Sequence, residues 1–216
     1  MNLFLNFLIA LGVVAALKDI PERARGGLAY KQYLKKMNPL TLSINSGDST
    51  AYSWNAKVDN FDASNNATYA QRYYVNDKYW TKGVGPVFYE IGGEGTLTGP
   101  PGGYIEQLAV KHGALLIALE HRFYGESIPN GNFNTDNYVY LTVEQALADL
   151  SGFTDYYKTV VTETASVPWF VFGGSYPGAL SSWYRATYPE QSVGSLSSSG
   201  MAMFLWEVNV VSDLFI

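Results

Sequence analysis

A buried strand, a glycine-rich turn and a helix follow one another directly in residues 169–178, which read WFVFGGSYPG. The first four residues are large and apolar, as in a strand that is covered on both faces of a sheet. Gly173 and Gly174 permit a tight turn, and Pro177 fits the first turn of a helix, where its missing N–H needs no partner. The stretch therefore predicts a strand–turn–helix unit with Ser175 in the turn.

Strands and helices alternate on both sides of this unit. Strands are predicted at about residues 70–75, 84–91, 114–120, 169–173 and 193–198, and the last four are apolar enough for burial on both faces. Helices are predicted from after residue 101 to His112, from residue 143, and from just after Ser175 to before Pro189. Such alternation is typical of an α/β fold, a mostly parallel sheet with helices on both faces.

The second helix has the clearest start. Thr142 and Gln145 form a capping-box pattern, in which each side chain can bond the other residue's free backbone N–H. An apolar stripe follows at helical spacing, which predicts packing on the sheet. Asp149 falls on the same helix, where we expect it to be solvated or ion-paired.

Ser175 is a candidate nucleophile because the turn lifts its hydroxyl above the sheet. Such a nucleophile elbow needs small neighbours, and Gly173 and Gly178 meet this need. The usual pattern G-x-S-x-G has a glycine where this chain has Pro177. A plain turn with an ordinary serine is one alternative. A phosphate-binding loop is disfavoured, because neither G-x-G-x-x-G nor a lysine after the glycines is present.

A second glycine-rich loop can complete an acyl-transfer site. Residues 92–95, GGEG, follow the predicted strand 84–91. Acyl transfer needs two N–H donors for the oxyanion, one from the residue after the nucleophile and one from a loop after an earlier strand. Tyr176 and Gly93 are the candidates, with an ordinary loop as the alternative for the latter.

Two motifs make the resemblance specific. Residues 120–127, EHRFYGES, together with residues 173–178, GGSYPG, resemble the prolyl carboxypeptidase family of serine peptidases, and the similarity extends over about residues 58–200. Within this family, the sequence resembles the thymus-specific type in particular. The resemblance implies an α/β-hydrolase fold with a helical cap and no cofactor or metal. It also implies a peptide substrate, cleaved beside proline or a small residue near a chain end through an acyl-enzyme on Ser175.

The general base is not evident. The chain has two histidines, His112 and His121, and both precede Ser175, whereas this fold places Asp and then His after the nucleophile. The only aspartate after Ser175 is Asp213. His121 is a disfavoured substitute, because it lies inside the EHRFYGES motif. We therefore expect residues 58–216 to be the N-terminal part of a longer peptidase domain, truncated after the nucleophile helix and the next strand, without useful turnover on its own.

Two other functions stay open: a catalytically inactive paralogue that acts as a binding protein, and an esterase on the same fold. The net charge of −5 argues against nucleic acid as a partner. The oligomeric state is not predicted.

The N-terminal residues predict a route through the cell. Residues 1–17 resemble a secretory signal peptide, and residues 18–57 form a basic leader or propeptide-like segment. Asn66 lies in a sequon for N-glycosylation. These features predict the secretory pathway, with a lysosomal, vesicular or secreted destination. No integral membrane span is expected after signal removal, because no apolar stretch is long enough.

Overall fold

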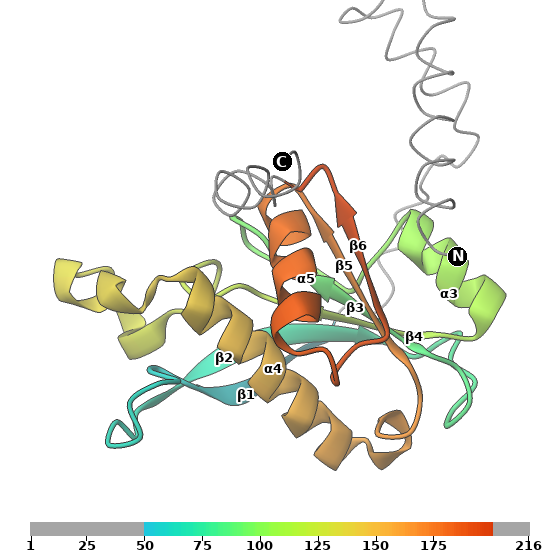
Figure 1. The fold of residues 1–216 in the computed structure, drawn as a ribbon, viewed down its shortest axis with the longest axis horizontal. Helices are drawn as coiled ribbons and strands as arrows, with labels where there is room; N and C mark the ends of the chain where they lie inside the picture. Colours follow the sequence, from blue (N-terminus) through green and yellow to red (C-terminus); the bar gives the residue numbers. More distant parts are fainter. Residues whose placement is uncertain (1–49, 201–216) are drawn as a thin grey trace, which may run out of the picture. The chain divides into compact units, whose positions relative to one another are not determined.

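The computed structural model describes residues 50–200, shown in colour in Figure 1. The chain divides into two units, Met1–Ser43 and Ile44–Ile216, and the described residues belong to the second. The predicted signal peptide, most of the basic leader and Asp213 therefore lie outside the described residues. Within those residues, no helix has the length and apolarity that crossing a bilayer requires.

In the part of the chain that the structure describes, six strands form one mixed sheet in the order β1-β2-β4-β3-β5-β6. Their bounds are β1 Ala51–Lys57, β2 Thr68–Asn76, β3 Val87–Ile91, β4 Leu115–Leu119, β5 Trp169–Gly174 and β6 Gly194–Ser198. β4, β3, β5 and β6 are parallel neighbours, whereas β1 with β2 and β2 with β4 pair antiparallel. The mostly parallel sheet confirms the predicted fold class.

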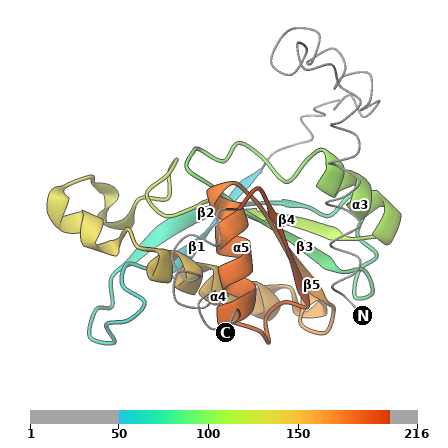
Figure 2. The same cartoon turned by 45° about the horizontal axis from the view of Figure 1, so that its top comes forward.

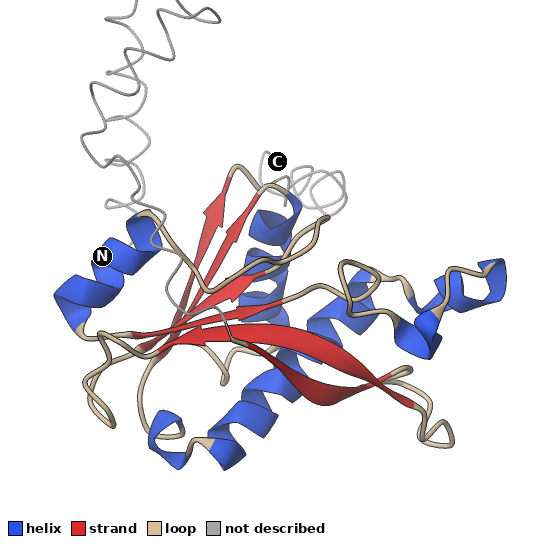
Figure 3. Ribbon diagram, turned by 180° about the vertical axis from the view of Figure 1, so that it is seen from behind, coloured by secondary structure: helices blue, strands red, loops and turns tan. Residues whose placement is uncertain are grey.

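Among residues 50–200, three α-helices cover the sheet from both sides: α3 Tyr104–His112, α4 Val143–Val160 and α5 Tyr176–Thr187. Short 3-10 turns lie at Pro129–Gly131, Thr135–Tyr140 and Thr162–Thr164. α4 and α5 lie in front of the sheet in Figure 1 and behind it in Figure 3. Their apolar faces share the larger core with Tyr89 of β3, while Ile105 and Ala109 of α3 pack with Phe88 on the other face. The mostly parallel sheet and the strand–turn–helix unit of β5 and α5 agree with the predicted α/β-hydrolase fold.

The capping box at the start of α4 forms only in part. Thr142 accepts a hydrogen bond from the Gln145 backbone N–H at 3.2 Å, as predicted. The Gln145 side chain does not return to Thr142. It accepts from the Asn60 N–H at 2.9 Å and donates to Asp59 at 2.6 Å, so it ties α4 to the loop after β1.

Two strands differ from the sequence expectation. β1 lies in residues grouped with the basic leader, and its pattern of exposure is mostly that of an exposed edge strand, with only Ala56 buried. A charge pattern carries no information about backbone pairing, so this strand was not predicted. β6 was expected to be buried on both faces, and this was wrong. Its residues are mostly exposed, with Leu196 50% accessible. Within the described residues β5 is its only strand partner.

Candidate active site

Ser175 lies between β5 and α5 in a backbone conformation that few residues adopt. Its φ of 61° and ψ of −129° fall outside the regions that are favourable for a residue with a side chain. The Ser175 N–H donates to the Ser198 carbonyl at the end of β6, with 2.9 Å between N and O. Strain of this kind persists where surrounding contacts hold it, and it is concentrated at functional sites. The serine is exposed. The β5–α5 junction that carries it lies at the carboxyl end of β5 (Figure 2).

Two glycines allow strand and helix to meet at this turn. A Cβ on Gly173 would lie 2.0 Å from the Pro177 carbonyl oxygen. On Gly178 it would lie 2.9 Å from the Ser198 oxygen. The predicted need for small residues at these positions is confirmed. Pro177 occupies the first turn of α5, as expected from its sequence position.

Gly173→Ala is expected to disrupt the elbow, while Gly174→Ala is tolerated. The new methyl at position 173 overlaps backbone, which cannot move aside without shifting α5, whereas a Cβ on Gly174 has nothing within 4 Å. We expect Gly173→Ala to lower the free energy of unfolding by about 1–3 kcal/mol, as overpacking does. Urea unfolding of both variants measures the difference. Equal stability of the two would contradict this account of the turn.

The loop with the second predicted N–H donor lies against the elbow. A Cβ on Gly93 would be 2.8 Å from Cγ of Pro177, so the loop backbone and the start of α5 are in close contact. Gly92 donates its N–H to the Leu119 carbonyl at 2.8 Å, which fixes the loop on the end of β4. The structure therefore places Gly93 against Pro177, the residue that follows Tyr176.

His121 follows the end of β4 and contacts the elbow, but through Tyr176. Its Nδ1 lies 2.7 Å from the Arg122 carbonyl oxygen and its Nε2 lies 3.0 Å from the Tyr176 hydroxyl. Both ring nitrogens therefore have partners, and neither is Ser175. Burial lowers the pKa of His121, which favours the neutral ring, and burial raises the pKa of Tyr176 to about 12. This geometry gives no support to His121 as the base.

In the EHRFYGES motif, the buried Glu120 carboxylate holds neighbouring backbone and side chains in place. The Glu120 carboxylate accepts four hydrogen bonds, from Arg72 Nη2 at 2.6 Å, the Leu97 N–H at 2.9 Å, the Glu126 N–H at 3.0 Å and the Ser127 hydroxyl at 2.7 Å. Gly125, with φ of 57°, passes so close that a Cβ would overlap the carboxylate. The motif thus folds its own loop around Glu120.

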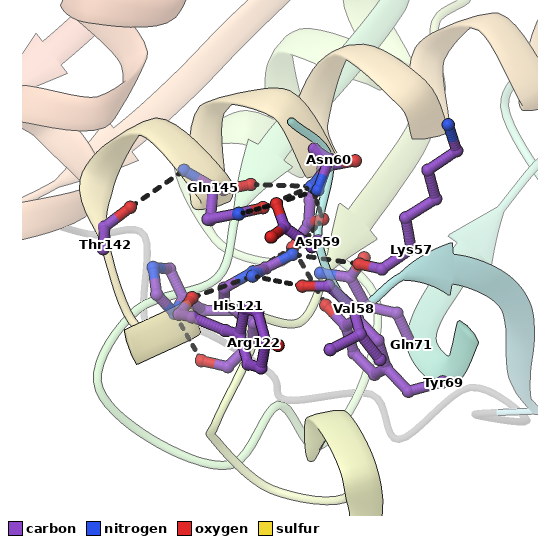
Figure 4. Close-up of polar contacts among 12 residues, drawn as sticks. Lys57, Val58, Asp59, Asn60, Tyr69, Gln71, His121, Arg122, Thr142 and Gln145 are labelled. Atoms are coloured by element: carbon purple, nitrogen blue, oxygen red, sulfur yellow. Dashed lines mark hydrogen bonds and ion pairs between the residues drawn. The ribbon is translucent and has the colours of Figure 1, made fainter. Parts of the chain in front are cut away.

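Arg122 and Asp149 form an ion pair that the sequence did not reveal as buried. Their side chains are 0% and 2% exposed, and Arg122 Nη2 lies 2.6 Å from Asp149 Oδ1. Arg122 also donates to the backbone carbonyls of Lys57 and Val58 (Figure 4) and to that of Tyr140. The pair joins β4, α4 and the segment after β1. Spacing along the chain could not indicate this contact, because the two residues are 27 positions apart.

The other candidate residues lie away from the elbow. His112 ends α3 and is exposed. Asn66 is exposed in the loop between β1 and β2. Among residues 50–200, no cluster of three or more His, Asp or Glu side chains has the arrangement of a metal site.

Comparisons with known proteins point to one family. The profile described as serine carboxypeptidase S28 matches residues 56–212. Thymus-specific serine protease of Homo sapiens is 38% identical over 160 residues, covering 73% of this chain and 31% of that protein. Lysosomal Pro-X carboxypeptidase of Homo sapiens is 35% identical over 167 residues, covering 75% of this chain and 34% of that protein. The chain spans about a third of the length of the curated relatives it matches.

Solved structures show a more distant likeness. An acylaminoacyl peptidase of Pyrococcus horikoshii superposes with a TM-score of 0.47 at 11% identity, over 70% of this chain and 23% of that one. An α/β serine hydrolase of Xanthomonas campestris gives a TM-score of 0.39 at 15% identity, over 65% of this chain and 57% of that one.

Proposed function

The chain belongs to the serine carboxypeptidase S28 family, and from this premise we propose that it carries the nucleophile and oxyanion hole of a serine exopeptidase. Ser175 Oγ attacks the carbonyl carbon of the scissile peptide bond while its proton passes to a general base. The tetrahedral intermediate then collapses to an acyl-enzyme, and the amine leaves with a proton from the same base. Water releases the acid by the reverse steps.

The observation that carries this proposal is the conformation of the elbow. Ser175 is exposed at the carboxyl edge of the parallel strands, and its strained backbone is held by the Ser198 carbonyl and by close glycine contacts. The Tyr176 N–H, at the start of α5, is the proposed first oxyanion donor, and the neighbouring Gly93 N–H is the second. Donors of this kind stabilise charge that develops in the transition state.

The base and its carboxylate are proposed to come from residues that follow Ile216 in the full-length protein. Chain order in this fold requires an Asp and then a His after the serine. Residues 176–216 contain one aspartate, Asp213, and no histidine. The 216 residues alone are therefore expected to show no useful turnover.

The name of one relative suggests a substrate and a location. This relative is called a Pro-X carboxypeptidase and lysosomal, which supports proline-adjacent cleavage of peptides in the secretory or lysosomal route. Asn66 is exposed on the loop between β1 and β2, so its side chain is open to a glycan on that route. A mass decrease after N-glycosidase treatment of the secreted or lysosomal protein tests the glycan.

The function is tested with peptides that differ only at their ends. The full-length protein is incubated with a proline-containing peptide in four forms: both ends free, the amino end acetylated, the carboxyl end amidated, and both ends blocked. An exopeptidase cleaves the free peptide and fails on the doubly blocked one, and the single blocks distinguish carboxypeptidase from dipeptidyl peptidase. Equal cleavage of all four forms would contradict the proposal.

Two alternatives make different predictions in the same assay. A catalytically inactive binding protein is favoured by the lack of a base near Ser175 among the described residues, and it would bind peptide without cleaving any form. An esterase would hydrolyse a p-nitrophenyl ester and leave every peptide intact. Labelling of Ser175 by a fluorophosphonate separates the binding protein from both enzymes.

A further inference from the structure

We propose that His121 is a positioning residue of the nucleophile elbow. By accepting the hydrogen bond of the Tyr176 hydroxyl, it fixes the side chain of the residue that follows Ser175 and thereby the direction of the Tyr176 backbone N–H. The inference rests on the proposed function, in which that N–H binds the oxyanion.

The direction of this hydrogen bond follows from the other ring nitrogen. Nδ1 of His121 lies 2.7 Å from the Arg122 carbonyl oxygen, which can only accept, so Nδ1 carries the hydrogen. Nε2 of the neutral ring then has a free lone pair. The Tyr176 hydroxyl, 3.0 Å away, must donate to it. The lowered pKa of His121 and the raised pKa of Tyr176 both favour these protonation states.

The histidine is a rigid anchor because it is enclosed on several sides. It is 6% exposed. Its ring packs edge-on between Tyr124 and Tyr176, with 5.4 Å between ring centroids in each pair. Its backbone is approached by Gly92, where a Cβ would lie 3.1 Å from the His121 nitrogen. The next residue, Arg122, belongs to the buried ion pair with Asp149.

The charged groups near the His121 ring have opposite effects on its protonation. Asp149 and Glu94 favour the protonated ring, while Arg122 and burial oppose it. Burial has the largest effect, so the neutral acceptor form prevails.

His121 acts on Tyr176, whereas the backbone hydrogen bond to Ser198 holds Ser175. Ser175 is tied by its N–H to the Ser198 carbonyl, and Tyr176 is the first residue of α5. A tyrosine side chain has only two rotatable angles, so fixing its hydroxyl restrains its backbone as well. This restraint matters because displacements of about 1 Å at a catalytic centre can cost roughly 10²-fold in rate.

The test uses single-atom and same-size changes in the full-length protein. Tyr176→Phe removes only the hydroxyl, and His121→Leu removes the acceptor. His121→Gln keeps an acceptor near the position of Nε2. Tyr124→Phe is the matched control, because it keeps the other ring that packs on His121. The measurements are kcat and KM on the cleaved peptide, and the rate of fluorophosphonate labelling at Ser175.

We expect Tyr176→Phe and His121→Leu each to lower kcat and the labelling rate by about three- to tenfold, the effect of one neutral hydrogen bond, with KM within about twofold. The double variant should lose no more than either single one, because both remove the same contact. His121→Gln should recover part of the rate, and Tyr124→Phe should match the wild type. A purely structural role would lower the melting temperature without this kcat pattern.

The experiment distinguishes failure of the proposed function from failure of the positioning role. If the wild-type protein neither cleaves peptide nor labels at Ser175, the proposed function fails and this inference with it. If the wild type is active and Tyr176→Phe retains its kcat, or the losses of the two single variants multiply, the positioning role alone is wrong. Since Tyr176→Phe creates no cavity, misfolding of His121→Leu would not prevent this decision.

Discussion

Ser175→Ala in the full-length protein is expected to lower kcat by roughly 10⁶, as loss of the nucleophile does in serine proteases. The remaining oxyanion donors and substrate contacts cannot replace a covalent intermediate. The side chain of Ser175 is exposed, so the free energy of unfolding should change by less than about 0.5 kcal/mol. Peptide hydrolysis, fluorophosphonate labelling and urea unfolding together separate a chemical effect from a structural one.

The matched control for this variant is Ser64→Ala. Ser64 is also an exposed serine, in the loop between β1 and β2, where its hydroxyl bonds Asp62 at 2.6 Å. Its replacement should leave turnover unchanged. Retention of turnover by Ser175→Ala would place the nucleophile elsewhere and remove the basis of the proposed mechanism.

The second large effect is expected from the buried ion pair. Arg122→Met should lower the free energy of unfolding by about 3–5 kcal/mol, because it leaves the Asp149 carboxylate buried without its charge partner. All five N–H donors of Arg122 are used in the structure: two bind Asp149 and three bind backbone carbonyls. Asp149 in turn accepts from Tyr69 at 2.9 Å and Asn60 at 2.9 Å. Urea unfolding measures the loss.

An exposed ion pair provides the comparison. Lys82 and Glu163 lie 2.9 Å apart, with side chains 65% and 40% exposed. Lys82→Met should cost less than about 1 kcal/mol, because water solvates the remaining carboxylate. The double variant Arg122→Met/Asp149→Leu should recover part of the loss of Arg122→Met, since no unpaired charge remains. Similar costs for Arg122→Met and Lys82→Met would show that the buried pair does not support the fold as described.

Much of the fold could be predicted because it depends on local patterns. The run WFVF predicts a strand, and the glycines before and after Ser175 predict a turn that only small residues allow. The structure places β5 at Trp169–Gly174 and α5 at Tyr176–Thr187, which agrees with this reading. β1 was missed because its polar, mixed sequence has no clear period, and its pairing with β2 decides its conformation.

The candidate site likewise has features that depend on local sequence and features that depend on tertiary contacts. The sequence by itself determined the elbow, the candidate nucleophile and the glycine loop, because short-range sterics require particular residues at fixed spacing. Only the tertiary structure decided what the EHRFYGES segment does: Glu120 holds its own loop, Arg122 pairs with Asp149, and His121 meets Tyr176. The last two contacts join residues that are 27 and 55 positions apart. Their energies come from burial and from the geometry of facing side chains, and neither is encoded in the spacing of residues along the chain.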